Sequence, residues 1–222
     1  MHMPYCHLDT WRFLSAIKKR YRPDRVICLG DEIDGHALSY HESDPDLDSA
    51  GPELEKAIKF LRPLYRMFPV VDVLESNHGS LIYRKAKTAG IPKRSLKSYR
   101  DNLEAPHGWR WHFEMRLQMS DGNWLYLHHG KSSRPGELSR DEGSSAVQGH
   151  FHTKFQVTYR RTHSGLYFDM HCGYLADHDG LAMAYDKGNP KKGIVGAAVI
   201  LNGRPLMLPM RMNARGRWTG HL

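Results

Sequence analysis

Side chains that can hold divalent metals follow four apolar runs of this 222-residue sequence. The run RVICL leads into GDEIDG, and the run VVDVLE leads into SNHGS. A third run, NWLYL, ends in HHG, and the short run AVQ is followed by GHFH. Carboxylate oxygens and imidazole nitrogens are ligands for Mn, Fe, Zn and Ni. Because ligands gather at the carboxyl ends of strands in α/β sheets, the pattern predicts one shared metal centre.

The candidate ligands differ in what each can contribute. Asp31 offers two oxygens, so it can bridge two cations about 3.5–4 Å apart. Alternate side chains of a strand share a face, so His150 and His152 can reach the same cluster. His128 and His129 point to opposite faces for the same reason, and the glycine after His129 favours His129 as the ligand. The candidates are therefore Asp31, Asn77, His129, His150 and His152.

These residues need a layered scaffold, and the first half of the sequence predicts one. Residues 8–21 and 53–68 carry apolar side chains at helical spacing, which predicts two helices. Each is followed by a short apolar run, at 25–30 and at 70–76, that is typical of a buried strand. This alternation of helices and strands predicts an α/β fold.

The second half of the sequence is richer in strand patterns. The predicted strands are 109–119, 123–129, 154–161, 166–172 and 194–201. The dipeptides Asp121-Gly122 and Asn202-Gly203 are typical of hairpin turns. The stretch 36–52 is polar and rich in turn residues, so we expect it to form an active-site loop.

The composition fits one domain over residues 1–222, with 211–222 as a loosely ordered basic tail. The formal net charge of +8 favours polyanionic partners such as nucleic acid or phosphorylated substrates. The three cysteines lack CxxC spacing, so neither a disulfide framework nor a thiolate zinc site is expected. No apolar run is long enough to span a bilayer and no signal-peptide pattern is present, so we expect a cytoplasmic protein.

In their order along the chain, the motifs GDxxD, NH, HG and GHxH resemble those of the calcineurin-like metallophosphoesterase family. With HMPYCH they cover residues 2–152, and the sequence is similar in look to small phosphoesterases of bacteriophages and their hosts. The resemblance implies a four-layer α/β/β/α sandwich of two mixed sheets. It also implies two divalent metal ions, manganese first with iron, zinc or nickel as alternatives, and a host cytoplasm if the chain is phage-encoded.

The resemblance implies a role for each candidate. Asp31 would bridge both metals, with one site completed by Asn77, His129 and His150 and the other by His152 and His2. His78 would be the catalytic histidine that protonates the leaving oxygen. Asp34 would orient His78 in a carboxylate–imidazole dyad. The nucleophile would be a metal-bridging hydroxide.

The sequence departs from the family pattern in three places. The family opens with Asp-x-His, and HMPYCH resembles the continuation of that motif with His2 as its histidine. Because the aspartate would precede Met1, we expect a start further upstream. The alternatives are a depleted first metal site, or replacement of the aspartate by the Met1 α-amino group or a nearby side chain. Ser76 stands in place of a glycine, and Gly79 in place of an acidic residue, which affects specificity rather than the metals.

Several basic residues are candidate substrate contacts by position. They are His36, His41, Arg84 and Lys131. The basic clusters 84–100 and 211–217 could follow a nucleic-acid backbone, but a solvated surface is an equal alternative where no aromatic side chains are interleaved.

The function expected from these features is metal-dependent hydrolysis of a phosphodiester by a phosphodiesterase or nuclease, with nucleic acid or a nucleotide as substrate. Two alternatives remain open. One is a phosphomonoesterase acting on a nucleotide or a protein. The other is a non-catalytic nucleic-acid-binding protein that retains a metal centre. The oligomeric state is not predicted.

Overall fold

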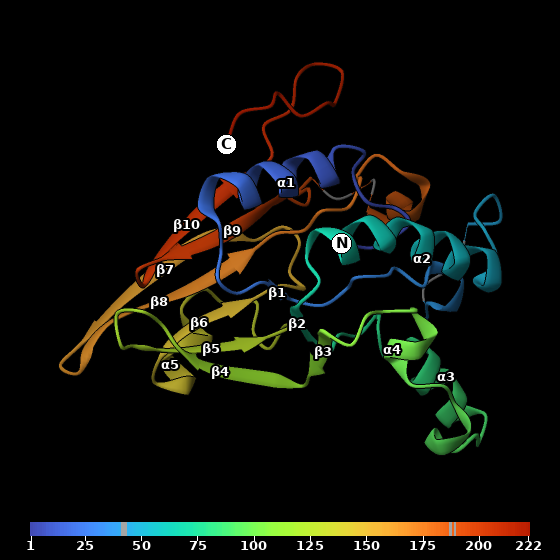
Figure 1. Ribbon diagram of the computed structural model, residues 1–222, viewed down its shortest axis with the longest axis horizontal. Coiled ribbons are helices and arrows are strands. Elements are labelled where there is room, and N and C mark those ends of the chain that lie inside the picture. Colours follow the sequence, from blue (N-terminus) through green and yellow to red (C-terminus); the bar gives the residue numbers. More distant parts are fainter. Residues whose placement is uncertain (41–43, 187, 189) are drawn as a thin grey trace.

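The protein has a mixed α/β fold in a computed structural model that describes residues 1–40, 44–186, 188 and 190–222 (Figure 1). The α-helices of this part are α1 (Thr10–Tyr21), α2 (Ala50–Met67), α3 (Leu81–Thr88), α4 (Tyr99–Asn102) and α5 (Glu137–Glu142). Three 3-10 helices are η1 (His36–Leu38), η2 (Lys93–Ser95) and η3 (Leu181–Asp186). The first strands are β1 (Ile27–Cys28), β2 (Val71–Leu74), β3 (Trp109–His112), β4 (Glu114–Gln118) and β5 (Trp124–His128). The later strands are β6 (Ser145–Gln148), β7 (Phe155–Thr162), β8 (Gly165–Cys172), β9 (Gly196–Leu201) and β10 (Arg204–Pro209).

The described strands form three sheets. The sheet β1-β2-β3 is entirely parallel, and the five-stranded sheet β4-β5-β6-β8-β7 is mixed. Strands β9 and β10 form a separate antiparallel hairpin. Two mixed sheets were expected. The five-stranded sheet is mixed, but the three-stranded sheet is parallel.

The five-stranded sheet carries apolar side chains on both faces. On β5, Leu125 and Leu127 belong to one buried cluster, while Tyr126 between them belongs to another. The first cluster also contains Leu74 of β2 and is covered by Ala198 of β9. The second contains Leu138 of α5. The alternation along the strand therefore turns one face toward the other two sheets and the opposite face toward α5.

Helices α1 and α2 cover the remaining faces. Leu61 and Leu64 of α2 pack with Val71 and Val73 of β2. Phe13 of α1 packs in a separate cluster with residues of the β9–β10 hairpin and its surroundings. In Figure 1 both helices lie above the strands. The apolar stripes predicted in residues 8–21 and 53–68 are thus the faces that the helices bury.

Both hairpin turns predicted from sequence are confirmed. Asp121-Gly122 joins the antiparallel strands β4 and β5, and Asn202-Gly203 joins β9 and β10. Asn202 and Gly203 have φ of 49° and 75°, the left-handed pair that a two-residue hairpin of this type needs. The predicted strand 109–119 is instead two strands in different sheets, which separate at Phe113.

The C-terminal segment is docked, contrary to the expected loose tail. The buried carboxylate of Asp9 accepts two hydrogen bonds from the Arg217 guanidinium, both of 2.8 Å, and a third from the backbone N–H of Trp218. The Trp218 ring lies edge-on to Phe13 of α1, with ring centroids 5.5 Å apart. A paired carboxylate and a buried ring hold this part of the tail against α1.

Within the described residues, no helix is both long enough and apolar enough to cross a membrane.

Candidate metal centre

A short parallel pairing brings the start of the chain to the end of β1. The backbone N–H of His2 donates to the carbonyl of Asp31 at 2.6 Å, and Met3 pairs with Ile33. His2 and Asp31 both have positive φ, of 57° and 51°, and so does His150, with 61°. This conformation costs energy for residues other than glycine and is concentrated at functional sites. Three of the predicted metal ligands share it.

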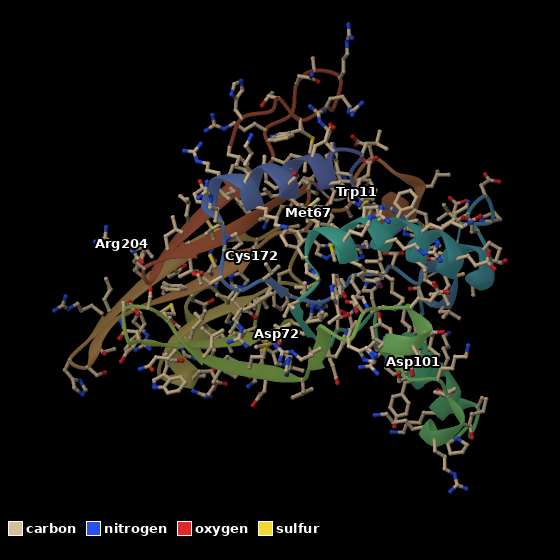
Figure 2. All side chains as sticks on the ribbon, viewed as in Figure 1. Trp11, Met67, Asp72, Asp101, Cys172 and Arg204 are labelled. Carbon is tan, nitrogen blue, oxygen red and sulfur yellow. The ribbon has the colours of Figure 1, made fainter. Side chains whose placement is uncertain are left out.

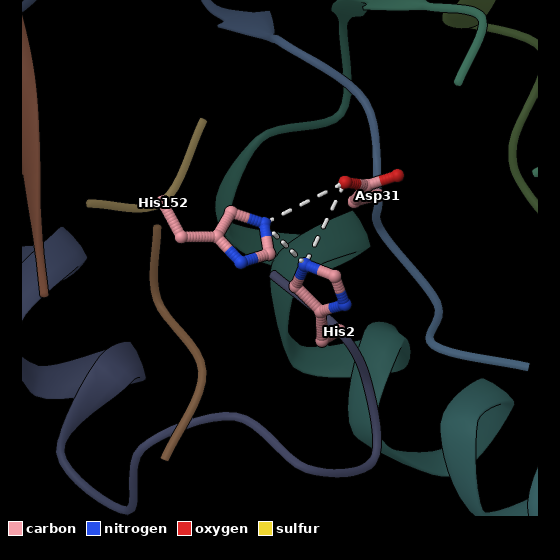
Figure 3. A group of neighbouring side chains, drawn as sticks. All are labelled: His2, Asp31 and His152. Atoms are coloured by element: carbon pink, nitrogen blue, oxygen red, sulfur yellow. Dashed lines mark hydrogen bonds and ion pairs between the residues drawn. The ribbon is translucent and has the colours of Figure 1, made fainter. Parts of the chain in front are cut away.

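The first group of potential ligands is formed by His2, Asp31 and His152 (Figure 3). The Nε2 atoms of His2 and His152 lie 3.1 Å apart. Asp31 Oδ2 lies 3.6 Å from His2 Nε2 and 3.9 Å from His152 Nε2. One ligand atom of each residue therefore points to a common centre.

The second group shares Asp31 and adds the ends of β2, β5 and β6. It contains Asp31, His129 and His150. His129 Nε2 lies 3.3 Å from Asp31 Oδ2 and 2.8 Å from Asn77 Oδ1. His150 Nδ1 lies 3.1 Å from the same Asn77 oxygen. The structure thus brings together all six predicted ligands in two groups that meet at one carboxylate.

The protonation states in these groups leave lone pairs facing one another. His129 Nδ1 lies 2.6 Å from the carbonyl oxygen of Leu29, which can only accept, so Nδ1 carries the proton. A neutral His129 then presents the Nε2 lone pair to the oxygens of Asn77 and Asp31. Three electron-rich atoms converge there, and none of the three carries a proton to share with the other two. A cation in that space would satisfy all of them, so the donor set fits a divalent metal.

A buried oxygen of Asp31 supports the same conclusion. Asp31 Oδ1 has no hydrogen-bond partner among the described residues, although such atoms normally have one. Burial disfavours its charged form, but the His152 hydrogen bond and the nearby His2 and His129 outweigh this and hold the pKa of Asp31 well below its usual range. A metal ion is the partner that an ionised, unpaired carboxylate oxygen lacks.

The surrounding imidazoles are held in the neutral form that binds metals. Burial lowers the pKa of His2 from 6.5 to about 3, although the hydrogen bond to Asp34 opposes the shift. Burial also lowers the pKa values of His129 and His150. Neutral imidazoles and an ionised carboxylate are the protonation states that metal binding requires.

Asp34 takes a different position from the one expected. Its carboxylate lies 2.7 Å from His2 Nδ1, whereas His78 Nδ1 is 3.8 Å from the carboxylate and instead donates to the backbone carbonyl of Asp34. The expected dyad with the His78 side chain is therefore not formed. Since His2 Nδ1 donates to Asp34, His2 Nε2 is left free to face the cluster, as is usual for a metal-bound histidine with a carboxylate behind it.

A third group of possible ligands consists of His2, Asp34 and His78. Here the close nitrogen and oxygen atoms are already paired, because both imidazole Nδ1 atoms donate to oxygens of Asp34. The group is therefore explained by hydrogen bonds and does not need a cation.

Glycines permit the close approach of the ligand-bearing loops. Gly30 has φ of 97°, and a side chain there would meet His129 Nδ1 at 2.6 Å and Ser76 Cβ at 2.7 Å. A Cβ at Gly130 would clash with the side chain of His150. These glycines explain why the motifs GD and HG pair a ligand with a residue that has no side chain.

The candidate substrate contacts do not line the cluster as a set. His36 is buried, with Nε2 accepting from the N–H of Asp44 and Nδ1 3.9 Å from Asp34 Oδ2. Arg84 donates to the carbonyl of Asn77 at 2.8 Å. His41 lies outside the described residues.

Lys131 lies on the α5 side of the five-stranded sheet. Its Nζ atom is 2.9 Å from Glu142 Oε1 and 3.2 Å from the hydroxyl of Tyr126. Both partners hold it away from the metal ligands, so the structure does not support the prediction that Lys131 contacts a phosphate.

Gln148 was not identified from the sequence but connects two ligand-bearing loops. Its buried side-chain oxygen accepts from the backbone N–H groups of Lys131 and Ser132, just after His129. His150 follows Gln148 by two residues. The signal in the sequence that could have indicated this role is a polar residue at the end of a predicted strand, directly before the GHFH motif.

The cluster is open on one side and buried on the other. His2, Asp31 and His129 are buried, whereas Asn77 and His150 are exposed. A cavity of about 560 Å³ adjoins the cluster, with His129 and His150 in its lining, and its other walls include apolar side chains of β1, β5 and β9. A charged ligand would lose its hydration against the apolar walls, so the exposed side, at Asn77 and His150, is the more favourable approach to the cluster.

Acid is expected to destabilise the metal-free protein through His2. The unfolded chain protonates this histidine near pH 6.5 and the folded chain only near pH 3, so stability is complete above pH 6.5 and is lost as the pH falls through that window. Between pH 7 and pH 5 the free energy of unfolding should fall by about 2 kcal/mol more in the wild type than in His2→Gln. Urea unfolding in the presence of a chelator measures this difference.

The matched control for that experiment is His163→Gln, which replaces an exposed histidine of the β7–β8 hairpin. It should keep the wild-type dependence on pH. An unchanged dependence in His2→Gln would contradict the buried, neutral state of His2.

No protein-family model matches this chain, and a search of the curated proteins returns no match. What can be inferred about function therefore comes from the residues and their geometry.

Proposed function

We propose that this chain is a binuclear metal-dependent phosphoesterase of the calcineurin-like class, with a preference for phosphodiesters. The observation that carries the proposal is the shared carboxylate of Asp31, which belongs to both ligand groups and has one buried oxygen without a partner. Sites with two metals 3.5–4 Å apart are characteristic of phosphatases and nucleases.

The arrangement of the layers is compatible with this class. Helices α1 and α2 pack on strands of the two smaller sheets, these face the five-stranded sheet, and α5 covers the far side. We propose that this order corresponds to the four-layer α/β/β/α sandwich, with the β9–β10 hairpin lying in the same layer as β1-β2-β3.

The residues of the cluster would have two roles: six of them would bind the metal ions, and His78 would transfer a proton. One ion would be held by Asp31, Asn77, His129 and His150, and the other by Asp31, His2 and His152. Two divalent cations, manganese first, would supply Lewis acidity toward the phosphoryl group and a water nucleophile at neutral pH.

His78 is suited to proton transfer. Its Nδ1 donates to the Asp34 carbonyl, which leaves Nε2 as the atom that can carry a proton to the leaving oxygen. The Asp34 carboxylate lies 3.8 Å from the same Nδ1 atom, on the side of the ring away from Nε2.

Hydrolysis of two small esters tests the proposal. With Mn²⁺ the protein should cleave bis-p-nitrophenyl phosphate faster than p-nitrophenyl phosphate, and a chelator should stop both reactions until Mn²⁺ is returned. Faster cleavage of the monoester would overturn the diester preference. Failure to cleave either ester with Mn²⁺, Fe²⁺, Zn²⁺ or Ni²⁺ would overturn the proposed function.

A further inference from the structure

A projecting segment rich in lysine and arginine begins next to the open side of the cluster. We use the name basic arm for residues 81–100, which comprise α3, η2 and the start of α4 and extend away from the sheets (Figure 1). Its first residue follows His78 by three positions, and Arg84 donates to the carbonyl of Asn77. The arm is therefore continuous with the exposed ligand and with the candidate proton donor.

The charge of the basic arm is of one sign. It contains no aspartate or glutamate, and its cations are Arg84, Lys85, Lys87, Lys93, Arg94, Lys97 and Arg100. Among the described residues the only carboxylate paired with these cations is Asp101, 3.8 Å from Arg100. Figure 2 shows nitrogen-tipped side chains spreading into solvent around Asp101. Lys87, Lys93, Arg94 and Lys97 are exposed, and exposed charge that no described carboxylate pairs with attracts a polyanion.

Aromatic rings are interleaved with these cations, a feature that the sequence did not reveal. Tyr83 and Tyr40 are 40% and 58% exposed, although large aromatic side chains usually find cover. The Lys93 ammonium lies 5.5 Å from the centre of the Tyr83 ring, and that of Lys85 lies 4.2 Å from the centre of the Tyr40 ring. Cations beside exposed rings can bind phosphates while the rings stack on bases.

We propose that the basic arm binds single-stranded nucleic acid and leads its backbone to the metal cluster. This inference rests on the proposed function, because it assigns the phosphodiester substrate of that site. A single strand fits better than a duplex, since its bases are available to stack on Tyr40 and Tyr83. The lysines would contact successive phosphates on one side of the bond at the cluster.

Binding of a fluorescent oligothymidylate to metal-free protein tests the arm without relying on catalysis. A triple variant, Lys87→Glu, Lys93→Glu and Lys97→Glu, should weaken binding at least about tenfold. It should also reduce the slope of log K against log salt by about 2, because each lost contact to a single strand removes about 0.7. Turnover of bis-p-nitrophenyl phosphate by this variant with Mn²⁺ should stay within about twofold of the wild type.

The matched control makes the same change in net charge elsewhere. Lys19→Glu, Arg20→Glu and Lys59→Glu alter exposed positions of α1 and α2. Equal weakening by both triple variants would overturn the arm as the binding surface. Tighter binding to vesicles containing phosphatidylglycerol than to the oligonucleotide would also overturn the proposal and assign the arm to a membrane surface.

The two proposals can fail separately. If the oligonucleotide binds through the arm but no ester is hydrolysed, the proposed function is wrong, whereas the assignment of the arm as a nucleic-acid-binding surface is retained. If the small diester is hydrolysed and the oligonucleotide does not bind, the assignment of the arm is wrong, whereas the proposed phosphoesterase activity is retained.

Discussion

Asp31→Ala is expected to lose both metal ions and at least about 1,000-fold in turnover of bis-p-nitrophenyl phosphate. The reason is geometric, because Asp31 is the one residue common to both ligand groups. Removing it also removes the only carboxylate of each group. Metal analysis after gel filtration and calorimetric titration with Mn²⁺ measure the stoichiometry, and the affinity of each site should fall more than about 100-fold.

Two further variants define what this result means. His2→Ala should lose one ion and keep the other, because His2 belongs to the first shared group and not to the group of His129 and His150. Asp141→Ala, at an exposed position of α5, should retain both ions and full turnover. Two ions bound to Asp31→Ala with wild-type affinity would rule out the shared carboxylate as a bridge.

The convergence of the ligands could be predicted from sequence because it depends on strand ends. Asp31, Asn77, His129 and His150 each follow a short strand, and β1, β2, β5 and β6 end in the same region although they belong to two sheets. Sheets that pack face to face with aligned strands bring such ends together. The sequence pattern therefore carried most of the information about the candidate site.

The role of Asp34 could not be predicted in the same way. The motif GDxxD places a carboxylate near the cluster, but it does not specify which histidine the carboxylate meets. That choice depends on the pairing of Met3 with Ile33, which sets His2 beside Asp34, and on the loop that turns His78 toward the Asp34 carbonyl. Both are tertiary features without a local signal.

The basic arm was also only partly visible in the sequence. Its lysines and arginines are evident, but α4 and η2 are too short to give a helical period. The exposed tyrosine beside Lys85 is Tyr40, which is far from the arm in the sequence. Interleaving of cations and rings across two segments therefore becomes apparent only in three dimensions.

His78→Ala is expected to lower kcat by about 100- to 10,000-fold while both metal ions remain bound. His78 is absent from the two groups that share Asp31, and its Nδ1 is occupied by the Asp34 carbonyl. The loss should depend on the leaving group. A dinucleotide, whose leaving alkoxide needs a proton, should suffer more than bis-p-nitrophenyl phosphate, whose leaving nitrophenolate is stable without one.

This dependence separates proton donation from the other roles that His78 could have. A histidine that only stabilises charge on the phosphoryl group would, when removed, slow both esters by the same factor. Loss of a metal ion in His78→Ala would instead show that the third group, with His2 and Asp34, holds a cation. Only a larger loss on the dinucleotide, with the metal content unchanged, agrees with transfer of a proton from His78 Nε2.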